Sequence, residues 1–551
     1  MNDLNTNSFI RLCKPFYQAK KIEAWALVIA LIFLEILYVY ELLKINYWNK
    51  SFFDALQSYH ESSLIDLLTQ FLILVTIIIV TFMSKSFAQL WLALRWRTFL
   101  TQHFLSRWMH KNHFYHLRLI DPNIDNPDQR IANDIDCFVN LTLSLSIGAF
   151  HAIAMCTTFL FVLAQLSGPM ALEIWGIHIN IPCYLVWVAL LYTGSSTLIT
   201  HAIGRSLKKL YYTSEKREAD LRYHLIRIQE NAESIALYRG MNRETYQANH
   251  FFQRIIEITI PIIKKRLLLG IFTNLYHNFS SLIPIFFMAP RYFAKQMSWG
   301  VLMQSVSAFS YVQGALSWAI DAYTDIATYR TTLQRLIQLN HALDQTIDQP
   351  KLIFQKQDKG IFSWQNMTIY RPDMNILCQP NNWASHPGLT RLVGPSGCGK
   401  TTLFRTIMGI WPFATGTIEL NQDQTILMLP QQSYLPIGSL HQILTYPTIK
   451  TIADKVINQW LDRFNLMHLK TQNTTQWDKQ LSGGEKQKIA IIRALIHKPD
   501  VLLMDEATSA LDSHAQKLAL DTIVESLPNC TILFIEHHSH PNIQCSTIQL
   551  Y

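Results

Sequence analysis

The segment LTRLVGPSGCGKTTLFRTIMGI has residue types and spacing that suit phosphate binding. Gly394 precedes Gly399 by five positions, and Lys400 and Thr401 follow at once, after an apolar stretch and before an expected helix. Backbone N–H groups of such a loop wrap phosphates at a helix N-terminus, the lysine reaches the β and γ phosphates, and the threonine offers a Mg²⁺ ligand. The expected nucleotide-binding residues are Gly394, Pro395, Ser396, Gly397, Cys398, Gly399, Lys400, Thr401 and Thr402.

A second motif, VLLMDE, places an acidic pair directly after four apolar residues. Asp505 is expected to assist Mg²⁺ binding, and Glu506 is positioned to act as general base on an attacking water. The alternative is a strand that runs into a capped helix at DEATS. That alternative explains Asp505 but not its pairing with a phosphate loop, so the sequence predicts hydrolysis of a nucleoside triphosphate.

The segment LSGGEKQKIAIIRAL, residues 481–495, contains a third chemical feature. Ser482, Gly483 and Gly484 open a helix and so form another anion-binding N-terminus, which is of no use to a phosphate loop in the same domain that is already filled. This segment resembles the signature of ATP-binding cassette (ABC) proteins. The resemblance implies that these three residues cap the γ-phosphate of ATP held by another cassette, and a chain with one cassette should therefore form a homodimer.

The same resemblance implies roles for single residues elsewhere in the cassette. Gln431 resembles the glutamine that links nucleotide to membrane domain, with a catalytic role and a place beside Mg²⁺, and Asp512 resembles the aspartate of the loop between cassettes. His537 resembles the histidine that contacts the γ-phosphate, with His538 as the alternative register. Tyr370 could stack on adenine or simply pack in the core.

The chain that must position these chemical groups divides into two halves. The chain has 551 residues, 49% of them hydrophobic and 16% charged, which suits a membrane half joined to a soluble half. Scattered cysteines without a C-x-x-C pair indicate neither a zinc site nor a disulfide framework. The first apolar run lacks a cleavage site and is expected to be a retained anchor. The expected membrane spans are residues 25–45, 64–83, 141–167, 181–203, 267–289 and 299–320.

Charge in the connecting segments predicts their orientation. The formal net charge is +8, and bases concentrate in residues 84–140 and 204–266, whereas residues 168–180 contain no Lys or Arg. The long segments are therefore expected to be cytoplasmic and, from their apolar spacing, helical. Because the positive charge has this explanation, nucleic acid is not an expected partner.

The membrane half resembles a narrower group within the ABC family. The stretches LRWRTFLTQHFLSRW, NPDQR, EADLRYHLIRIQENAESIALYRG and APRYF are similar to those of subfamily D half-transporters, which carry acyl-CoA or cobalamin, and of bacterial relatives of peptide-antibiotic uptake permeases. The resemblance implies short cytoplasmic helices that couple the membrane domain to the cassettes. Asp128, Gln129, Arg130 and Glu233 are the expected coupling residues, together with Asp512. The alternative for Arg130 is a surface ion pair with Asp134.

Polar residues inside the expected spans are candidates for lining a transport cavity. They are Glu35, Asn274, His277 and Gln304. The alternative for the last three is hydrogen bonding between helices.

These features and the resemblance together predict an ABC half-transporter. The expected fold is a six-helix, exporter-type membrane domain over residues 1–335, a linker over 336–360 and an α/β P-loop ATPase over 361–551. ATP and Mg²⁺ are the expected cofactors, and the lipid bilayer and a small solute or peptide the expected partners. We expect a hydrophilic or amphipathic solute such as cobalamin or a peptide to cross a bacterial inner membrane by alternating access, with import favoured. Alternatives are an exporter, an acyl-CoA transporter, a peroxisomal location, and an ATP-gated channel or regulatory ATPase, which a degenerate Glu506 would have favoured.

Overall fold

The structure is a computed structural model that describes residues 6–59, 61–120, 126–174, 177–345, 352–357, 362–421, 424–448, 452–472, 474–536 and 545–550. The chain forms two compact units. The first comprises Met1–Phe104 and Pro127–Ile337, and the second comprises Leu105–Asn126 and Gln338–Tyr551. The first is mainly helical and the second contains the two five-stranded β-sheets of an α/β domain, which confirms the expected fold class.

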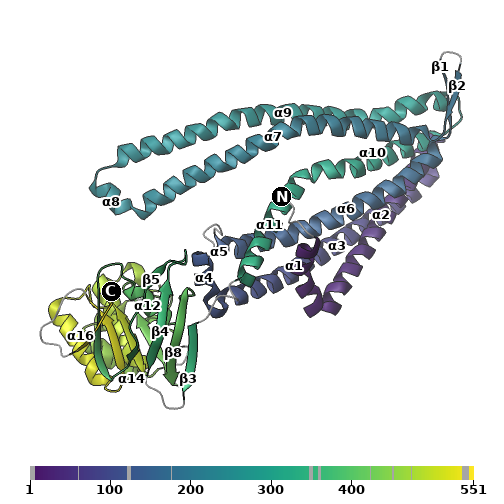
Figure 1. Cartoon of the computed structure of the whole chain (residues 1–551). Helices are drawn as coiled ribbons and strands as arrows, with labels where there is room; N and C mark the ends of the chain where they lie inside the picture. The colour runs from purple at the N-terminus through teal and green to yellow at the C-terminus, as the bar shows by residue number, and fades with distance from the viewer. Residues whose placement is uncertain are drawn as a thin grey trace. The chain divides into compact units, whose positions relative to one another are not determined.

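Long helices build the first unit (Figure 1). After α1 (Thr6–Ala19), the expected spans lie in six of them, although the fourth span was placed three residues too early. These six are α2 (Lys21–Gln57), α3 (Glu61–Met109), α6 (Ile135–Ser167), α7 (Tyr184–Glu230), α9 (Met241–Phe293) and α10 (Trp299–Asp321). The short α8 (Ala232–Leu237) joins α7 to α9, and α11 (Tyr323–Gln345) follows α10.

Within the described residues, four helical segments are long and apolar enough to cross a membrane: Lys21–Gln57, Leu64–Leu119, Pro127–Ser167 and Tyr184–Glu230. The helices over the last two expected spans, α9 and α10, are not among these four. A physical reason is clear for α10, which packs against α2, α6, α7 and α9 and therefore presents much of its surface to protein. Buried polar residues such as Gln304 and Gln313 are tolerated on such a helix because neighbouring helices supply hydrogen bonds.

The hydrophobic core of the first unit forms where α6, α7, α9 and α10 meet. Its centre contains Phe159, Leu185, Met288 and Phe309, all of which are fully buried. One element was not expected from the sequence. The connection between α6 and α7 forms an antiparallel hairpin of β1 (Met170–Ile174) and β2 (Ile177–Ile181), in which Met170 pairs with Ile181.

Two sheets build the second unit. One of them is wholly parallel, with strand order β12-β7-β11-β10-β9. Its strands are β7 (Gly388–Val393), β9 (Ile426–Leu429), β10 (Val501–Asp505), β11 (Thr531–Ile535) and β12 (Ser546–Gln549). All residues of β10 and β11 are buried, as expected for central strands of a sheet covered on both faces. Ligands of such sheets bind at the carboxyl ends of the strands.

The second sheet has the order β3-β8-β4-β5, with β6 paired to β4. Its strands are β3 (Leu352–Gln357), β4 (Ser363–Tyr370), β5 (Ile376–Cys378), β6 (Trp383–Ala384) and β8 (Ala414–Asn421). The helices of this unit are α12 (Lys400–Ile407), α13 (Leu440–Thr445), α14 (Asp454–Arg463), α15 (Gly483–His497) and α16 (Ser513–Ser526). The core on one side includes Trp477, Ile491 and Leu502, and Phe404 of α12 belongs to a second core that includes Trp364 and Leu503.

Each of the two units consists of two separate segments of the chain, so a single boundary does not divide them. The second unit begins at Gln338, within the expected linker, but it also includes Leu105–Asn126, which lies far inside the expected membrane domain. The reason is local packing of α4 (His113–Ile120). His116 Nε2 lies 3.0 Å from the carbonyl oxygen of Ile410, and Leu119 packs against the core around Phe404.

Candidate functional site

The phosphate loop lies between β7 and α12, where the sequence predicted it. Gly397 and Gly399 have φ angles of 81° and 101°, a region that glycine enters without the steric cost of a Cβ. A Cβ on Gly394 would lie 2.7 Å from the carbonyl oxygen of Leu550, so a side chain does not fit there either. Lys400 Nζ donates to the carbonyl oxygens of Gly394 (2.7 Å) and Pro395 (2.9 Å) and so folds back over the loop.

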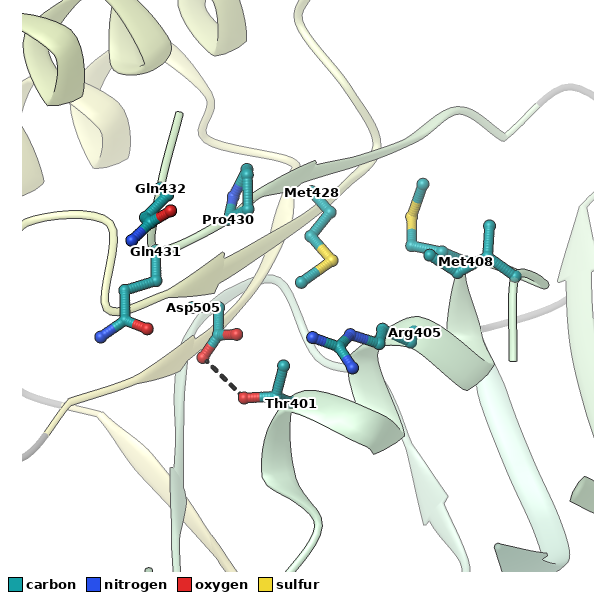
Figure 2. Close-up of a pocket in the computed structure, with 9 residues that line it drawn as sticks. Thr401, Arg405, Met408, Met428, Pro430, Gln431, Gln432 and Asp505 are labelled. Carbon is teal, nitrogen blue, oxygen red and sulfur yellow. Dashed lines mark hydrogen bonds between the residues drawn. The ribbon is translucent and has the colours of Figure 1, made fainter. Parts of the chain in front are cut away.

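The acidic end of β10 lies beside the first turn of α12. Thr401 Oγ1 donates to Asp505 Oδ1 over 3.2 Å, as the dashed line in Figure 2 shows. Asp505 is buried, and desolvation raises the pKa of its carboxyl, an effect that the hydrogen bond from Thr401 partly offsets. A buried carboxylate next to a threonine hydroxyl is a pair of oxygen donors of the kind Mg²⁺ prefers.

Glu506 and Gln431 face each other at this end of the sheet. Gln431 Nε2 donates to Glu506 Oε2 over 2.7 Å. Glu506 has a φ of 49°, a left-handed conformation that costs a non-glycine residue about 1 kcal/mol or more. Its backbone N–H donates to the carbonyl oxygen of Ile535 on the next strand (3.1 Å), which helps to hold this turn.

A pocket of about 660 Å³ opens between these residues. Figure 2 shows Thr401 and Asp505 at its base, Gln431 on one side, and Arg405 and Met408 on the other. Its lining residues are Thr401, Arg405, Met408, Ile410, Met428, Pro430, Gln431, Gln432 and Asp505. They come from α12, β9 and β10 and the segments that follow them, which brings the predicted metal residues Thr401, Gln431 and Asp505 together.

The serine and glycines of residues 481–495 lie elsewhere on the second unit. Ser482 caps α15, and its hydroxyl accepts a hydrogen bond from the backbone of Glu485, whose side chain accepts from the Ser482 backbone in return. Ser482 and Gly483 are exposed. Among the residues described, none of Ser482, Gly483 and Gly484 lines the pocket at Thr401.

Gln487 connects this helix to the turn at Glu506 and was not predicted as a site residue. It is buried, its Nε2 donates to the Glu506 carbonyl oxygen (3.4 Å) and to Ser509 Oγ (3.2 Å), and its Oε1 accepts from the Ala510 N–H (2.8 Å). A glutamine four positions after Gly483, the glycine that opens the helix, is the available signal. Asp512 caps α16 by accepting from the Ala515 N–H (2.8 Å), which holds the pKa of its carboxyl below the usual range.

The structure does not place two of the expected cassette residues, Tyr370 and His537, at the pocket. Tyr370 lies at the end of β4, partly buried against the core that contains Leu403, and its carbonyl oxygen accepts from Trp411 Nε1 (3.0 Å). The packing of Tyr370 against this core suits the alternative in which its ring has a structural role. His537, with His538, lies outside the described residues.

The expected coupling residues all belong to the first unit except Asp512. Asp128 and Gln129 are exposed on the single turn α5 (Pro127–Gln129), and Glu233 is exposed in the first turn of α8. Arg130 is buried, and its Nη1 donates to the carbonyl oxygen of Arg335 (2.9 Å), while Arg335 Nε lies 3.1 Å from Asp134 Oδ2. Arg130 and Asp134 are thus buried residues that hold α11, not a surface pair.

The cavity candidates divide into paired and exposed side chains. Gln304 Nε2 donates to Asn46 Oδ1 (3.1 Å), and Asn46 Nδ2 donates to the Gln304 carbonyl oxygen (3.0 Å), which fits the alternative of interhelical bonding. Asn274 and His277 are exposed on α9, and Asn274 Nδ2 also donates to the Gly270 carbonyl oxygen (2.8 Å) of its own helix.

Glu35 is 1% exposed and lies in a cluster that the sequence did not predict. Its Oε2 is 2.9 Å from Lys85 Nζ on α3, and its Oε1 is 2.5 Å from His151 Nδ1 on α6. A second buried carboxylate, Glu41, accepts from Thr81 Oγ1 (3.0 Å) six residues along α2. Single charged residues near expected spans were the available signal for these partners.

Comparison with known proteins agrees with both units. Residues 14–293 match the family described as "ABC transporter transmembrane region 2", and residues 384–509 match the family described as "ABC transporter". The chain is 30% identical over 536 residues to the "Inner membrane ABC transporter ATP-binding protein YddA" of Escherichia coli, with 96% of this chain and 94% of that protein covered.

More distant relatives belong to subfamily D. The chain is 27% identical to the "ABC transporter D family member 2, chloroplastic" of Arabidopsis thaliana (85% of this chain, 75% of that protein) and 24% identical to the human "ATP-binding cassette sub-family D member 3" (78% and 71%). Its fold is similar to the "Structure of a bacterial Atm1-family ABC exporter with ATP bound", with a TM-score of 0.70, 16% identity, and coverage of 93% of this chain and 92% of that one. Together with the phosphate loop, the acidic pair and the membrane helices, these matches show that the chain belongs to the ABC transporter family, as a subfamily D-like half-transporter whose ATPase domain hydrolyses ATP to drive transport.

Proposed function

We propose that two copies of this chain form a homodimer that moves a hydrophilic or amphipathic solute, such as cobalamin or a peptide, across a bacterial inner membrane by alternating access. One observation carries the dimer. The pocket at Thr401 and Asp505 and the exposed anion-binding end of α15 at Ser482 are separate surfaces of one cassette. Each is half of a nucleotide site, and a second cassette supplies the missing half to each.

The arm formed by α7 and α9 supports the same proposal. The two helices lie side by side, with α8 at their end (Figure 1). Large apolar side chains are exposed at this end: Leu237, Tyr238, Met241 and Tyr246, with Tyr238 88% exposed. Several exposed large apolar side chains at one end of an arm are typical of an interaction site. We assign it to contact with the second copy.

Mg²⁺ would be held at the pocket by the Thr401 hydroxyl, the Asp505 carboxylate and the Gln431 side-chain oxygen. These oxygen donors fit the ion, and its charge would offset the desolvation that raises the pKa of buried Asp505. When bound, the ion neutralises charge on the phosphates during transfer. Two rearrangements by the chain itself are required. Lys400 Nζ must exchange the Gly394 and Pro395 carbonyls for phosphate oxygens, and Glu506 Oε2 must exchange Gln431 for the attacking water, from which it takes a proton.

Polar side chains of the membrane unit support the proposed class of solute. Glu35 is already paired with Lys85 and His151, and Gln304 with Asn46, so these residues stabilise the helix bundle. Asn274 and His277 are exposed polar residues on α9 and remain candidates for contact with a hydrophilic solute. Import is favoured, and the bacterial inner membrane accords with the description of the Escherichia coli relative as an inner membrane protein. Export, acyl-CoA transport or a peroxisomal membrane are the alternatives.

Reconstituted proteoliposomes test the transport proposal. Flux of cobalamin, a peptide and an acyl-CoA is measured with ATP inside or outside the vesicles, and Glu506→Gln is the matched control. ATP-dependent flux of cobalamin or peptide toward the side of the cassettes supports import. Flux of acyl-CoA, or flux in the opposite direction, supports those alternatives. ATP hydrolysis without flux of any solute would favour the regulatory ATPase or channel.

A native cysteine allows a direct test of the dimer. Cys398 lies in the phosphate loop, so a Ser482→Cys variant should form a disulfide between two chains when oxidised with ATP present. The double variant Ser482→Cys/Cys398→Ser should not. If both variants give the same amount of covalent dimer, the two surfaces do not face each other.

The coupling proposal concerns Asp128, Gln129 and Arg130. Arg130 fixes α11, the helix through which the chain reaches the second unit, so its removal should loosen the connection between hydrolysis and transport. We expect Arg130→Gln to retain ATP hydrolysis and lose ATP-dependent flux. Loss of solute binding with the ratio of flux to hydrolysis unchanged would place these residues in the transport cavity instead.

A further inference from the structure

The helix α1 packs against the membrane unit by one face and exposes bases on the other. Leu12 and Phe16 are buried, and the Phe16 ring stacks on Trp96 of α3 with 5.9 Å between the ring centroids. Arg11 and Lys14, three positions apart, are exposed on the opposite face of the helix. Because protein already covers its apolar face, α1 has a basic face left for other contacts.

Two further bases continue this surface into α2. Lys20 lies at the junction of α1 and α2, Lys21 is the first residue of α2, and both side chains are exposed. The only acid among the described residues 6–23 is Glu23, and its Oε1 lies 3.0 Å from Arg95 Nε on α3. This segment therefore supplies no second carboxylate to offset its bases. We define the basic patch as the four exposed residues Arg11, Lys14, Lys20 and Lys21.

Two exposed tryptophans mark the level at which α2 and α3 leave the bilayer on the side of the basic patch. Trp25 on α2 and Trp91 on α3 are 50% and 39% exposed, and tryptophan is enriched at membrane–water interfaces. The Arg95 guanidinium lies over the Trp91 ring, 5.0 Å from its centroid, and also pairs with Glu23. Further from the basic patch, both helices expose large apolar side chains, as a lipid-facing surface does: Ile29, Phe33 and Ile36 on α2, and Phe82, Phe87 and Leu90 on α3.

The distance from this level to the basic patch fits a phospholipid headgroup. Lys20 and Lys21 precede Glu23 by three and two residues, which is about 3–5 Å along a helix axis. The headgroup region of a bilayer is roughly 5–8 Å thick on each side. Arg11 and Lys14 belong to a helix that ends one residue before Lys20. Anionic headgroups attract bases at this depth, because the membrane surface that they form has a negative potential.

We propose that the basic patch binds anionic phospholipid headgroups, of the phosphatidylglycerol type, in the leaflet on the side of α1, which is expected to be the cytoplasmic one. Charge complementarity selects this partner, since the patch carries bases whose apolar neighbours are buried in protein. Bound lipid holds α1 in its place on Trp96 and so stabilises the membrane unit. The inference requires the membrane unit to lie in a bilayer and is independent of the proposed dimer and of the solute.

Lipid binding to the detergent-solubilised full-length protein tests this inference. Native mass spectrometry gives the Kd for phosphatidylglycerol and for phosphatidylcholine. Melting midpoints show whether either lipid or inorganic phosphate stabilises the folded protein, because a ligand that binds the folded state raises the midpoint. The test variant removes the basic patch by four replacements, Arg11→Gln, Lys14→Gln, Lys20→Gln and Lys21→Gln. The matched control removes the same charge from exposed positions on the arm formed by α7 and α9, by Lys216→Gln, Arg222→Gln, Arg227→Gln and Arg243→Gln.

Phosphatidylglycerol should bind the wild type and the control more tightly than phosphatidylcholine does, and it should raise their melting midpoints. In the test variant the Kd for phosphatidylglycerol should rise by at least about fivefold, since a single base near an anionic membrane surface is worth about that factor. Lys20→Gln/Lys21→Gln, which leaves α1 unchanged, should also raise this Kd by about fivefold or more.

Three results would overturn the inference. The first is an equal Kd for phosphatidylglycerol in the test variant and the control. The second is equally tight binding of the two lipids by the wild type, which would show that headgroup charge is not recognised. The third is stabilisation of the wild type by inorganic phosphate but by neither lipid, which would show that the patch binds a free anion and not a membrane surface.

Discussion

Replacing Lys85 by methionine should destabilise the membrane unit through the carboxylate that remains. Lys85 is 13% exposed and Glu35 1% exposed, and their charged atoms are 2.9 Å apart. Methionine retains the length and apolar contacts of the lysine stem but removes the charge and its position over the Tyr38 ring, 4.7 Å from the centroid. Removal of one partner of a buried ion pair costs about 3–5 kcal/mol. Since His151 still binds Glu35 Oε1, we expect about 3 kcal/mol.

This loss corresponds to a fall in melting temperature of roughly 6–12 °C, at about 2–4 °C per kcal/mol for a large domain. Detergent-purified protein is heated in steps, and the fraction that still elutes as folded protein in gel filtration gives the midpoint. The ion pair of Arg95 with Glu23 (3.0 Å) joins the same two helices but is 53% and 40% exposed, so Arg95→Met is the matched control. Its midpoint should change by about 2 °C or less, because exposed pairs contribute little.

A double variant separates the stranded charge from lost packing. Glu35→Gln/Lys85→Met removes both charges, and the amide can still bond His151, so at least half of the lost stability should return. Equal midpoints for Lys85→Met and the double variant would refute the reasoning, because the damage would then come from packing alone. A Lys85→Met midpoint within 1 °C of Arg95→Met, an interval of roughly a few tenths of a kcal/mol, would show that the pair is not buried in the folded protein.

Three further predictions concern the cassette. Glu506→Gln should lower ATP hydrolysis by about 10²- to 10⁴-fold while ATP binding is retained, as followed by phosphate release and nucleotide filter binding; unchanged hydrolysis would exclude Glu506 as the base. Alkylation of Cys398 should inhibit hydrolysis and bound ATP should protect, because the thiol lies in the phosphate loop, whereas equal inactivation with and without ATP would contradict its placement. Asp505→Asn should raise the melting temperature of the nucleotide-free protein, since burial raises the pKa of Asp505 and so disfavours its ionised form in the folded state. The sign gives a pH dependence: the advantage of the variant should shrink as pH falls through the raised pKa and the wild-type carboxyl becomes protonated, and an advantage that grows toward low pH would be inconsistent with this account.

The phosphate loop, the acidic pair and the signature serine could be predicted from the sequence because each occupies consecutive residues whose local conformation creates the chemistry. Gly397 and Gly399 illustrate this, since their positive φ angles are a property of the loop itself. Lys85 and His151 could not be predicted as partners of Glu35, because they are 50 and 116 positions away and meet only after three helices pack. The same limit applies to Gln487, which acts through backbone groups of residues about twenty positions later.

The expected coupling segment shows a different kind of limit. Charge and an interrupted helix drew attention to Asp128, Gln129 and Arg130, but within the second unit the contacts come from the preceding α4, through His116 and Leu119. The apolar residues of α4 resemble those of any amphipathic helix. The surface at Ile410 that α4 contacts forms only when the cassette folds. The coupling role of Asp128, Gln129 and Arg130 stays a prediction, and the sequence pattern did not predict the contacts that α4 makes within the second unit.

The inclusion of Leu105–Asn126 in the second unit has a consequence for how the protein can be taken apart. The backbone passes between the two units three times, after Phe104, after Asn126 and after Ile337. A cassette expressed from Gln338 onward would lack a segment whose His116 and Leu119 cover part of its own surface. The two units therefore alternate along the chain. A cassette that begins at Gln338 should be less soluble and less stable than one supplied with residues 105–126 in trans.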